Sequence, residues 1–119
     1  MLQFHCVLKV STEISIEDFK KLQLVVGQIE SAQPVEKSQK LLKLQVNLGF
    51  LGKRQIISGI AQFYDPEELV GKKIVVVANL KPVKIFGQLS EGMLLAVTSD
   101  EKVFVLEANK RSEPGSFVT

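Results

Sequence analysis

The sequence predicts an all-β fold with short helices, built as a small closed barrel of five strands. Strand-forming residues dominate from Leu22 onward, and apolar residues alternate with polar ones from Leu42 to Leu48. A short helix is expected between the third and fourth strands, which suits a closed barrel. A β-sandwich is the architectural alternative, but a helix in the middle of the chain disfavours it.

The first half of the chain begins with a helix signal and continues with strands. Ser15-Ile16-Glu17-Asp18 resembles a capping box, which predicts a short helix over about residues 16–21. Gly27 lies in the middle of the next predicted strand, where glycine often marks a bend or bulge. Strands are expected over residues 23–32, 42–48 and 54–60, with a glycine-containing turn over residues 49–53.

The second half opens with a compact helix signature from Asp65 to Gly71. Asp65 suits the N-cap, Pro66 the first helical position and Gly71 the stop. Further strands are expected over residues 74–80, 93–98 and 103–106, the last two as a hairpin, with a short final strand after Pro114-Gly115. Five strands or more with a short helix between the third and fourth fit a small closed barrel, and the OB-fold has five strands and a helix at that place.

Length and composition indicate one globular domain. The chain has 119 residues, of which 45% are hydrophobic and 24% charged. The alternation in the first ten residues is interrupted, so we expect residues 1–13 to be a linker or N-terminal extension and residues 14–119 to be the domain. A single cysteine, Cys6, cannot form an internal disulfide and favours a reducing compartment.

Catalysis has little support in the sequence. His5 is the only histidine, and it lies in the N-terminal stretch. We find no Cys/His ligand cluster, no GxGxxG motif and no Walker A loop, so no metal and no cofactor is expected, and the domain is predicted not to be an enzyme. Without a targeting signal or a membrane-length apolar run, the expected location is cytoplasmic.

Charge is distributed unevenly along the chain. The formal net charge is +2, yet the stretch from Lys37 to Lys84 contains nine basic and three acidic residues. This asymmetry suggests a basic face that could meet nucleic acid, although scattered, solvated lysines would give the same count.

Two neighbouring segments combine features that suit RNA. The first, Asn79–Gly87, places Lys81 and Lys84 around a rigid proline, and an adjacent Phe86 could stack on a base or ribose. A phenylalanine lies more often in the core, so burial is the simpler expectation for Phe86. In the second segment, Ser90-Glu91-Gly92-Met93, glycine allows close backbone approach and serine can donate to phosphate, but a tight turn would look the same.

Together these segments resemble a known family. Asn79-Leu80-Lys81-Pro82-x-Lys84 followed by Ser90-Glu91-Gly92-Met93 is similar to the paired motifs of the C-terminal tRNA-binding domain of methionyl-tRNA synthetase and of related free-standing tRNA-binding proteins. Three upstream segments agree: Ser38-x-Lys40-Leu41, Arg54–Ile60 and Tyr64–Lys72. The resemblance extends from about Ile14 to Val118 without large gaps.

The resemblance implies an OB-fold that binds tRNA by shape and backbone, and a homodimer in which additional C-terminal elements make much of the contact. Lysines and arginine are expected to contact the RNA backbone, Ser90 and Met93 to shape the surface, and Asn79 to hold its loop. The expected RNA-binding residues are Lys40, Lys43, Arg54, Asn79, Lys81, Lys84, Ser90 and Met93.

The chain also departs from the family pattern. Val25 and Val83 stand where the family usually has arginine, and Gln39 where it has aspartate. Removing an arginine from a phosphate weakens RNA binding and lowers its salt sensitivity. The alternative function is therefore a free-standing tRNA-binding protein or a chaperone-like dimer with little RNA binding.

Overall fold

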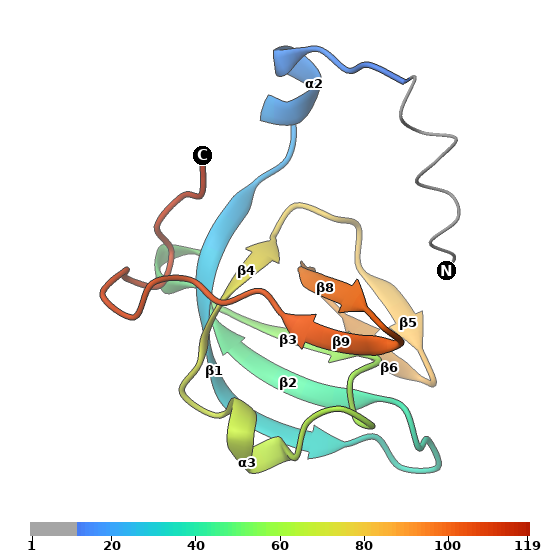
Figure 1. Cartoon of the computed structure of the whole chain (residues 1–119). Coiled ribbons are helices and arrows are strands. Elements are labelled where there is room, and N and C mark those ends of the chain that lie inside the picture. Colours follow the sequence, from blue (N-terminus) through green and yellow to red (C-terminus); the bar gives the residue numbers. More distant parts are fainter. Residues whose placement is uncertain (1–11) are drawn as a thin grey trace.

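The computed structural model describes residues 12–119, in which a five-stranded antiparallel sheet curls into a nearly closed barrel (Figure 1). The strand order is β3-β2-β1-β4-β7. These strands are β1 (Leu24–Pro34), β2 (Leu42–Asn47), β3 (Lys53–Ser58), β4 (Lys73–Val77) and β7 (Met93–Leu94). The predicted OB-type barrel is confirmed.

Two hairpins and three short helical turns complete the described part of the chain. The hairpins are β5 (Val83–Ile85) with β6 (Gln88–Ser90), and β8 (Ala96–Ser99) with β9 (Lys102–Val105). The helical turns are α2 (Ile16–Lys20), the 3-10 turn η1 (Gly49–Leu51) and α3 (Pro66–Leu69). Helix α3 lies between β3 and β4, as the sequence predicted, and Asp65 and Glu68 form its capping box. No helix within residues 12–119 is long and apolar enough to cross a membrane.

The core fills the barrel because inward-facing residues alternate with outward-facing ones along β2. Leu42, Leu44 and Val46 are buried, whereas the intervening Lys43 and Gln45 are only partly covered. Strand β4 is almost wholly buried, which agrees with its continuous run of apolar residues.

Gly27 leaves room for side chains that pack across the barrel, and the β-bulge of β1 lies between Ile29 and Ser31. The pairing of β1 with β2 shifts register between Ile29 and Ser31, and Gly27 pairs regularly with Ile74. A Cβ added at Gly27 would lie 2.6 Å from Val46 Cγ1. Of the predicted bend or bulge at Gly27, the bulge is therefore not found there, and close packing across the barrel requires the glycine.

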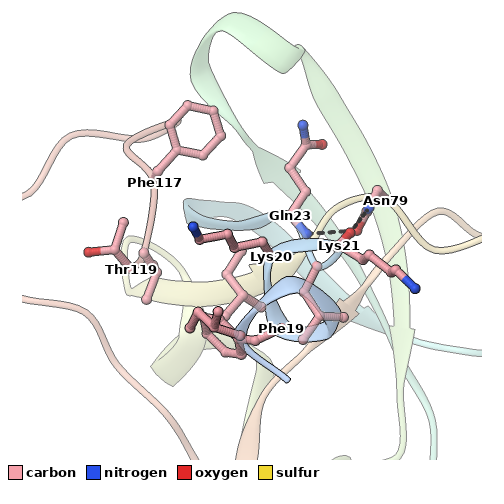
Figure 2. A pocket seen from close by; sticks show the side chains of 11 residues that line it. Phe19, Lys20, Lys21, Gln23, Asn79, Phe117 and Thr119 are labelled. Carbon is pink, nitrogen blue, oxygen red and sulfur yellow. Dashed lines mark hydrogen bonds between the residues drawn. The ribbon is translucent and has the colours of Figure 1, made fainter. Parts of the chain in front are cut away.

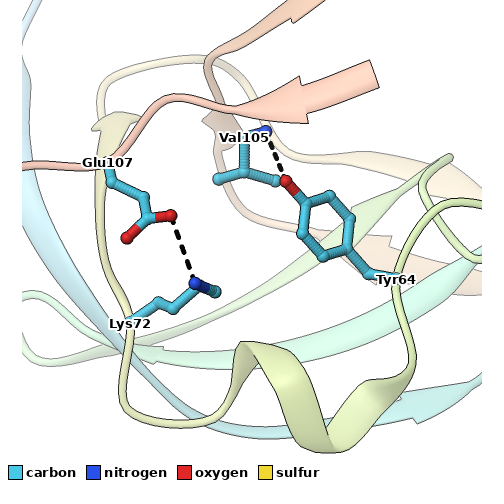
Figure 3. Close-up of polar contacts among 4 residues, drawn as sticks. All are labelled: Tyr64, Lys72, Val105 and Glu107. Atoms are coloured by element: carbon cyan, nitrogen blue, oxygen red, sulfur yellow. Dashed lines mark hydrogen bonds and ion pairs between the residues drawn. The ribbon is translucent and has the colours of Figure 1, made fainter. Parts of the chain in front are cut away.

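The predicted strand over residues 93–98 is divided in two. Residues 93–94 pair with β4, whereas residues 96–99 leave the barrel and pair with β9. The backbone N–H of Val105 donates a hydrogen bond of 3.0 Å to the hydroxyl of Tyr64, and Lys72 forms an ion pair of 3.1 Å with Glu107 (Figure 3). These contacts attach β9 and the chain that follows it to the barrel.

The C-terminal segment occupies an edge of β1. Strand β2 pairs with residues 28–34 of β1, and the segment after Pro114 bonds to residues 24–26 instead. An isolated bridge between Val25 and Phe117 takes the place of the predicted final strand. Figure 1 shows the C-terminus and α2 on the same upper side of the barrel. Most of the predicted extension over residues 1–13 lies outside the described residues.

Candidate nucleic-acid interface

Residues 83–90, for which the sequence predicted no strand, form the β5–β6 hairpin. Its two-residue turn consists of Phe86 and Gly87, with φ angles of 54° and 77°. Positive φ at both positions is typical of the type I′ turn, whose twist matches that of paired strands. Sequence reasoning missed the hairpin because Phe-Gly is a weak turn signal compared with Asn-Gly.

Side chains at the end of the hairpin and just after it close the barrel against the free edge of β3. The backbone N–H of Ile57 donates to Ser90 Oγ at 3.0 Å, and that of Gln55 donates to Glu91 Oε1 at 3.0 Å. Ser90 is only 3% exposed, and its hydroxyl also donates to the carbonyl of Gly92 at 3.2 Å. Ser90 therefore lies within the wall, below the solvent-facing surface.

A row of amides continues from the barrel to the hairpin. Gln45 and Gln55 are cross-strand partners on the outer face of β2 and β3, and Gln45 Nε2 donates to Gln55 Oε1 at 3.0 Å. Gln55 Nε2 in turn donates to the carbonyl of Leu89 at 2.8 Å. The hairpin and the residue after it are therefore attached to β3 in two ways: through backbone N–H groups at the edge of β3, and through the Gln55 side chain on the outer face of β3.

We call the resulting surface the hairpin face, defined as Lys43, Gln45, Gln55, Lys84, Phe86 and Leu89. Lys43 lies on the same side of β2 as Gln45, and Lys84 is opposite Leu89 in the hairpin. Lys40 and Lys81 are exposed three residues before these lysines. Within residues 12–119, none of these four lysines forms an ion pair, so their ammonium groups are available to phosphates.

Two of the predicted site residues have their polar groups engaged inside the protein. Arg54 Nη1 donates to the carbonyls of Ala78 at 2.9 Å and Glu91 at 3.4 Å. Asn79 Oδ1 accepts from the backbone N–H of Gln23 at 2.8 Å, and its Nδ2 donates to the carbonyl of Lys21 at 2.7 Å. Arg54 joins β3 to the segments that follow β4 and β6, whereas Asn79 fixes the start of β1.

The solvent exposure of the side chain differs among the other positions discussed from the sequence: Phe86, Met93 and Val83 are exposed, and Val25 is buried. Phe86 is 61% exposed, so the expectation that it belongs to the core was wrong. Met93 is 47% exposed at the start of β7. Of the two positions where the family usually has arginine, Val25 is fully buried and Val83 is 54% exposed. Of these two, Val83 alone replaces a side chain that could reach phosphate from the surface.

A second surface lies between α2 and the C-terminus. Figure 2 shows its groove, with Phe19 and Lys20 of α2 on one side and Phe117 on the other, and the Gln23–Asn79 hydrogen bond at its margin. Phe117 packs edge-to-face on Phe50 with ring centroids 5.9 Å apart. We call this surface the apolar groove, defined by the exposed side chains Ile16, Phe19, Leu22, Phe50 and Phe117.

A nearly closed five-stranded barrel with a polar, basic outer face on β2 and β3 belongs to the class of OB-type nucleic-acid-binding domains. Comparison with known proteins narrows this class. Residues 24–117 match the family model described as putative tRNA binding domain. Since the match spans most of the sequence, the chain belongs to this tRNA-binding family.

Relatives of the chain include much longer proteins. The methionine–tRNA ligase of Clostridium acetobutylicum is 54% identical over 108 residues, which are 89% of this chain and 17% of the ligase. The corresponding ligase of Archaeoglobus fulgidus is 52% identical over 106 residues, which are 16% of its length. The chain thus spans about a sixth of the length of these curated relatives.

Solved structures with the same fold include chains that are matched over almost their whole length. The MetRS-related protein of Pyrococcus horikoshii has a TM-score of 0.85 and 36% identity, covering 90% of this chain and 98% of that one. The chaperone CsaA of Bacillus anthracis has a TM-score of 0.82 and 29% identity, covering 91% and 100%. The fold of this chain is therefore shared with small proteins as well as with one part of long ligases.

Proposed function

We propose that this domain binds the backbone of folded tRNA through the hairpin face and serves a longer methionine–tRNA ligase as a non-catalytic module. The observation that supports this most directly is a set of four lysines that form no ion pair within residues 12–119, two of them in the hairpin face beside its row of amides and two in the segments that lead into it. Such a face offers point charges that can pair with phosphates.

In this proposal some of the predicted site residues touch the RNA, and the others hold the RNA-binding surface in position. Lys40, Lys43, Lys81 and Lys84 meet phosphates, and the exposed Met93 contributes apolar surface beside them. Ser90, Arg54 and Asn79 position this surface, because their polar atoms bond to the backbone of neighbouring segments. Binding then follows the spacing of phosphates on a folded RNA more than its base sequence.

The apolar groove supports a homodimer. Helix α2 has five residues and buries none of them, so it gains little from its own chain. Its apolar residues continue into those of the C-terminal segment and η1, which together expose several large hydrophobic side chains. A second copy of the chain would cover this surface symmetrically and remove it from water.

The aminoacylation reaction would lie in parts of the ligase outside this sequence. Within residues 12–119 there is no group of three or more potential metal ligands. The described residues supply binding surfaces, and the proposal assigns the module to raising the affinity of the ligase for tRNA. A cytoplasmic location is part of the same proposal, since tRNA and its ligases meet there.

A second candidate function is a chaperone-like dimer with little RNA binding. The specific observation in its favour is the structural likeness to CsaA, a protein described as a chaperone. The apolar groove would then bind unfolded segments of other proteins, and the exposed Val83 would reflect a weakened RNA surface.

The deciding experiment is a titration of the domain with folded bulk tRNA at low and at physiological salt, beside an unstructured RNA of equal length. We expect preferential binding of tRNA, with a logarithmic salt slope of about 0.7 to 0.9 for each phosphate contact. Lys84→Glu should lower the affinity and reduce the slope without changing the unfolding midpoint. Lys110→Glu makes the same charge change on an exposed residue of the segment after β9, and it should bind like the parent chain.

Three results would contradict the proposal. Equal binding of both RNAs would show that tRNA shape is not recognised. Unaltered affinity in Lys84→Glu would show that the hairpin face is not the contact surface. Negligible affinity for either RNA, together with binding of an unfolded protein, would favour the chaperone-like candidate.

A further inference from the structure

The geometry points to a second mode of contact within the same surface: we propose that Phe86 is a stacking platform for an unpaired nucleobase. The ligand class is therefore a nucleotide in a single-stranded part of the RNA, either a loop or a free end. This inference rests on the proposed RNA-binding function and adds base stacking to the phosphate contacts.

The first observation is backbone strain at the tip of the β5–β6 hairpin. Phe86 has φ 54°, in the left-handed region that L-residues with bulky side chains avoid. Asparagine and glycine are the residues favoured in such a turn, and the left-handed conformation is unfavourable for other residues. The hairpin would fold more easily with Asn at this position.

The second observation is that the side chain of Phe86 is largely exposed to solvent, so little packing within the chain offsets the backbone strain. Phe86 is 61% exposed, so the aromatic ring leaves most of its apolar area in water. The β8–β9 hairpin provides an internal comparison, because the two residues of its turn, Asp100 and Glu101, have φ 52° and 60°. That turn uses polar residues at the tip, whereas the β5–β6 hairpin uses an aromatic one.

The third observation is the chemistry around the ring. Lys84 lies two residues before Phe86 in the same hairpin, and Lys81 lies three residues before Lys84. An exposed ring two residues from an exposed lysine matches the chemistry of a nucleotide, which offers an aromatic base and a phosphate a few ångströms apart. In a double helix the base faces are covered by their neighbours, so only an unpaired nucleotide can use this platform.

The amide row holds this platform in place. Gln55 bonds to the carbonyl of Leu89, and Ser90 bonds to the N–H of Ile57, so the β6 strand is fixed to β3. A hairpin anchored at its base presents its tip with little ordering cost on binding.

The sequence contains no tryptophan, so Phe86→Trp would place a single indole reporter at the tip. We expect the fluorescence of this variant to be quenched by oligoadenylate of about twelve nucleotides and not by an RNA duplex of about forty base pairs at equal nucleotide concentration, because inside a long duplex the neighbouring pairs cover both faces of each base and open ends are few. Phe104→Trp, on the exposed face of the β8–β9 hairpin, is the matched control and should not respond to either RNA. Equal quenching of the Phe86→Trp variant by duplex and single strand, or no quenching by either, would overturn the platform.

Phe86→Leu tests the aromatic ring separately from apolar bulk. Loss of one stacked base costs about 1–3 kcal/mol, so affinity for tRNA should fall about 5- to 150-fold, and Phe86→Trp should retain it. Comparing intact tRNA with tRNA trimmed of its single-stranded 3′ end, and with an isolated stem–loop, assigns the base to an end or a loop. If Phe86→Leu binds like the parent while Lys84→Glu does not, stacking is refuted and the phosphate contacts stand. If the parent chain itself binds no RNA, that result contradicts both the proposed tRNA-binding function and the stacking role of Phe86.

Discussion

The hydroxyl of Ser90 accepts a hydrogen bond from the backbone N–H of Ile57 at 3.0 Å, and this contact helps to close the barrel. Strand β3 has a free edge at this point, because it is the last strand of the five-stranded sheet. A buried edge N–H needs an acceptor, and here a side chain supplies it in place of a neighbouring strand.

Ser90→Ala is expected to destabilise the domain. The change leaves the Ile57 N–H without its acceptor in a buried site, which costs about 1–3 kcal/mol. Denaturant unfolding followed by circular dichroism measures the effect. Ser116→Ala removes an exposed hydroxyl and should leave the free energy of unfolding within about 0.5 kcal/mol of the parent value. A stable Ser90→Ala variant with weakened tRNA binding would instead assign the hydroxyl to RNA contact.

Gly27→Ala should destabilise the domain through overpacking. The added methyl would lie 2.6 Å from Val46 Cγ1 and 2.7 Å from Leu48 Cδ2, so side chains across the barrel must shift. Forcing an extra carbon into a packed core costs about 1–3 kcal/mol. Gly59→Ala is the control, because nothing lies within 4 Å of its added carbon. Equal unfolding midpoints for the two variants would refute the packing role of Gly27.

Asn79→Ala should loosen the connection between α2 and β1. It removes the acceptor for the N–H of Gln23 and the donor to the carbonyl of Lys21, so amides near α2 should exchange faster with solvent. Asn79→Asp retains the acceptor alone and should give an intermediate exchange rate. Unchanged exchange in Asn79→Ala would show that the amide does not hold this segment.

Phe117→Glu is expected to weaken the proposed homodimer. The charge would be placed among Phe50 and the residues of the apolar groove, where a partner would exclude water. Sedimentation velocity over a range of concentrations should show a shift towards monomer. Phe104→Glu changes an exposed phenylalanine on the β8–β9 hairpin and should leave the association unchanged. A monomeric parent chain at all concentrations would contradict the homodimer.

Local sequence patterns predicted most of the barrel. The alternation of residues 42–48 indicated which side chains of β2 face the core, and the capping residues around Pro66 located α3 between the third and fourth strands. Both are short-range effects, in which neighbouring residues decide the conformation.

The candidate site was predicted less completely. Lys81 and Lys84 were proposed from their place around Pro82, and Lys40 and Lys43 from the family resemblance, and their contact with RNA stays a prediction. The hairpin itself was not predicted, because the strands β5 and β6 have only three residues each. The segment allowed two interpretations of Phe86, an exposed ring that could stack on RNA and a core residue, and the core was the simpler expectation. The position of Phe86 follows from the attachment of β6 to β3 by Gln55 and Ser90.

The sequence by itself determined the strands β1 to β4, the helix α3 and the excess of positive charge between Lys37 and Lys84, since each depends on residue type and local spacing. Tertiary structure alone decided that Ser90 closes the wall, that Arg54 and Asn79 bond to distant backbone, and that Val25 faces the core. The physical reason is that these roles depend on which distant segments meet when the barrel closes. The side chains of Arg54 and Asn79 bond to backbone carbonyls that are 24 and 58 residues away in the sequence. A local sequence pattern does not indicate which distant carbonyl a side chain will meet.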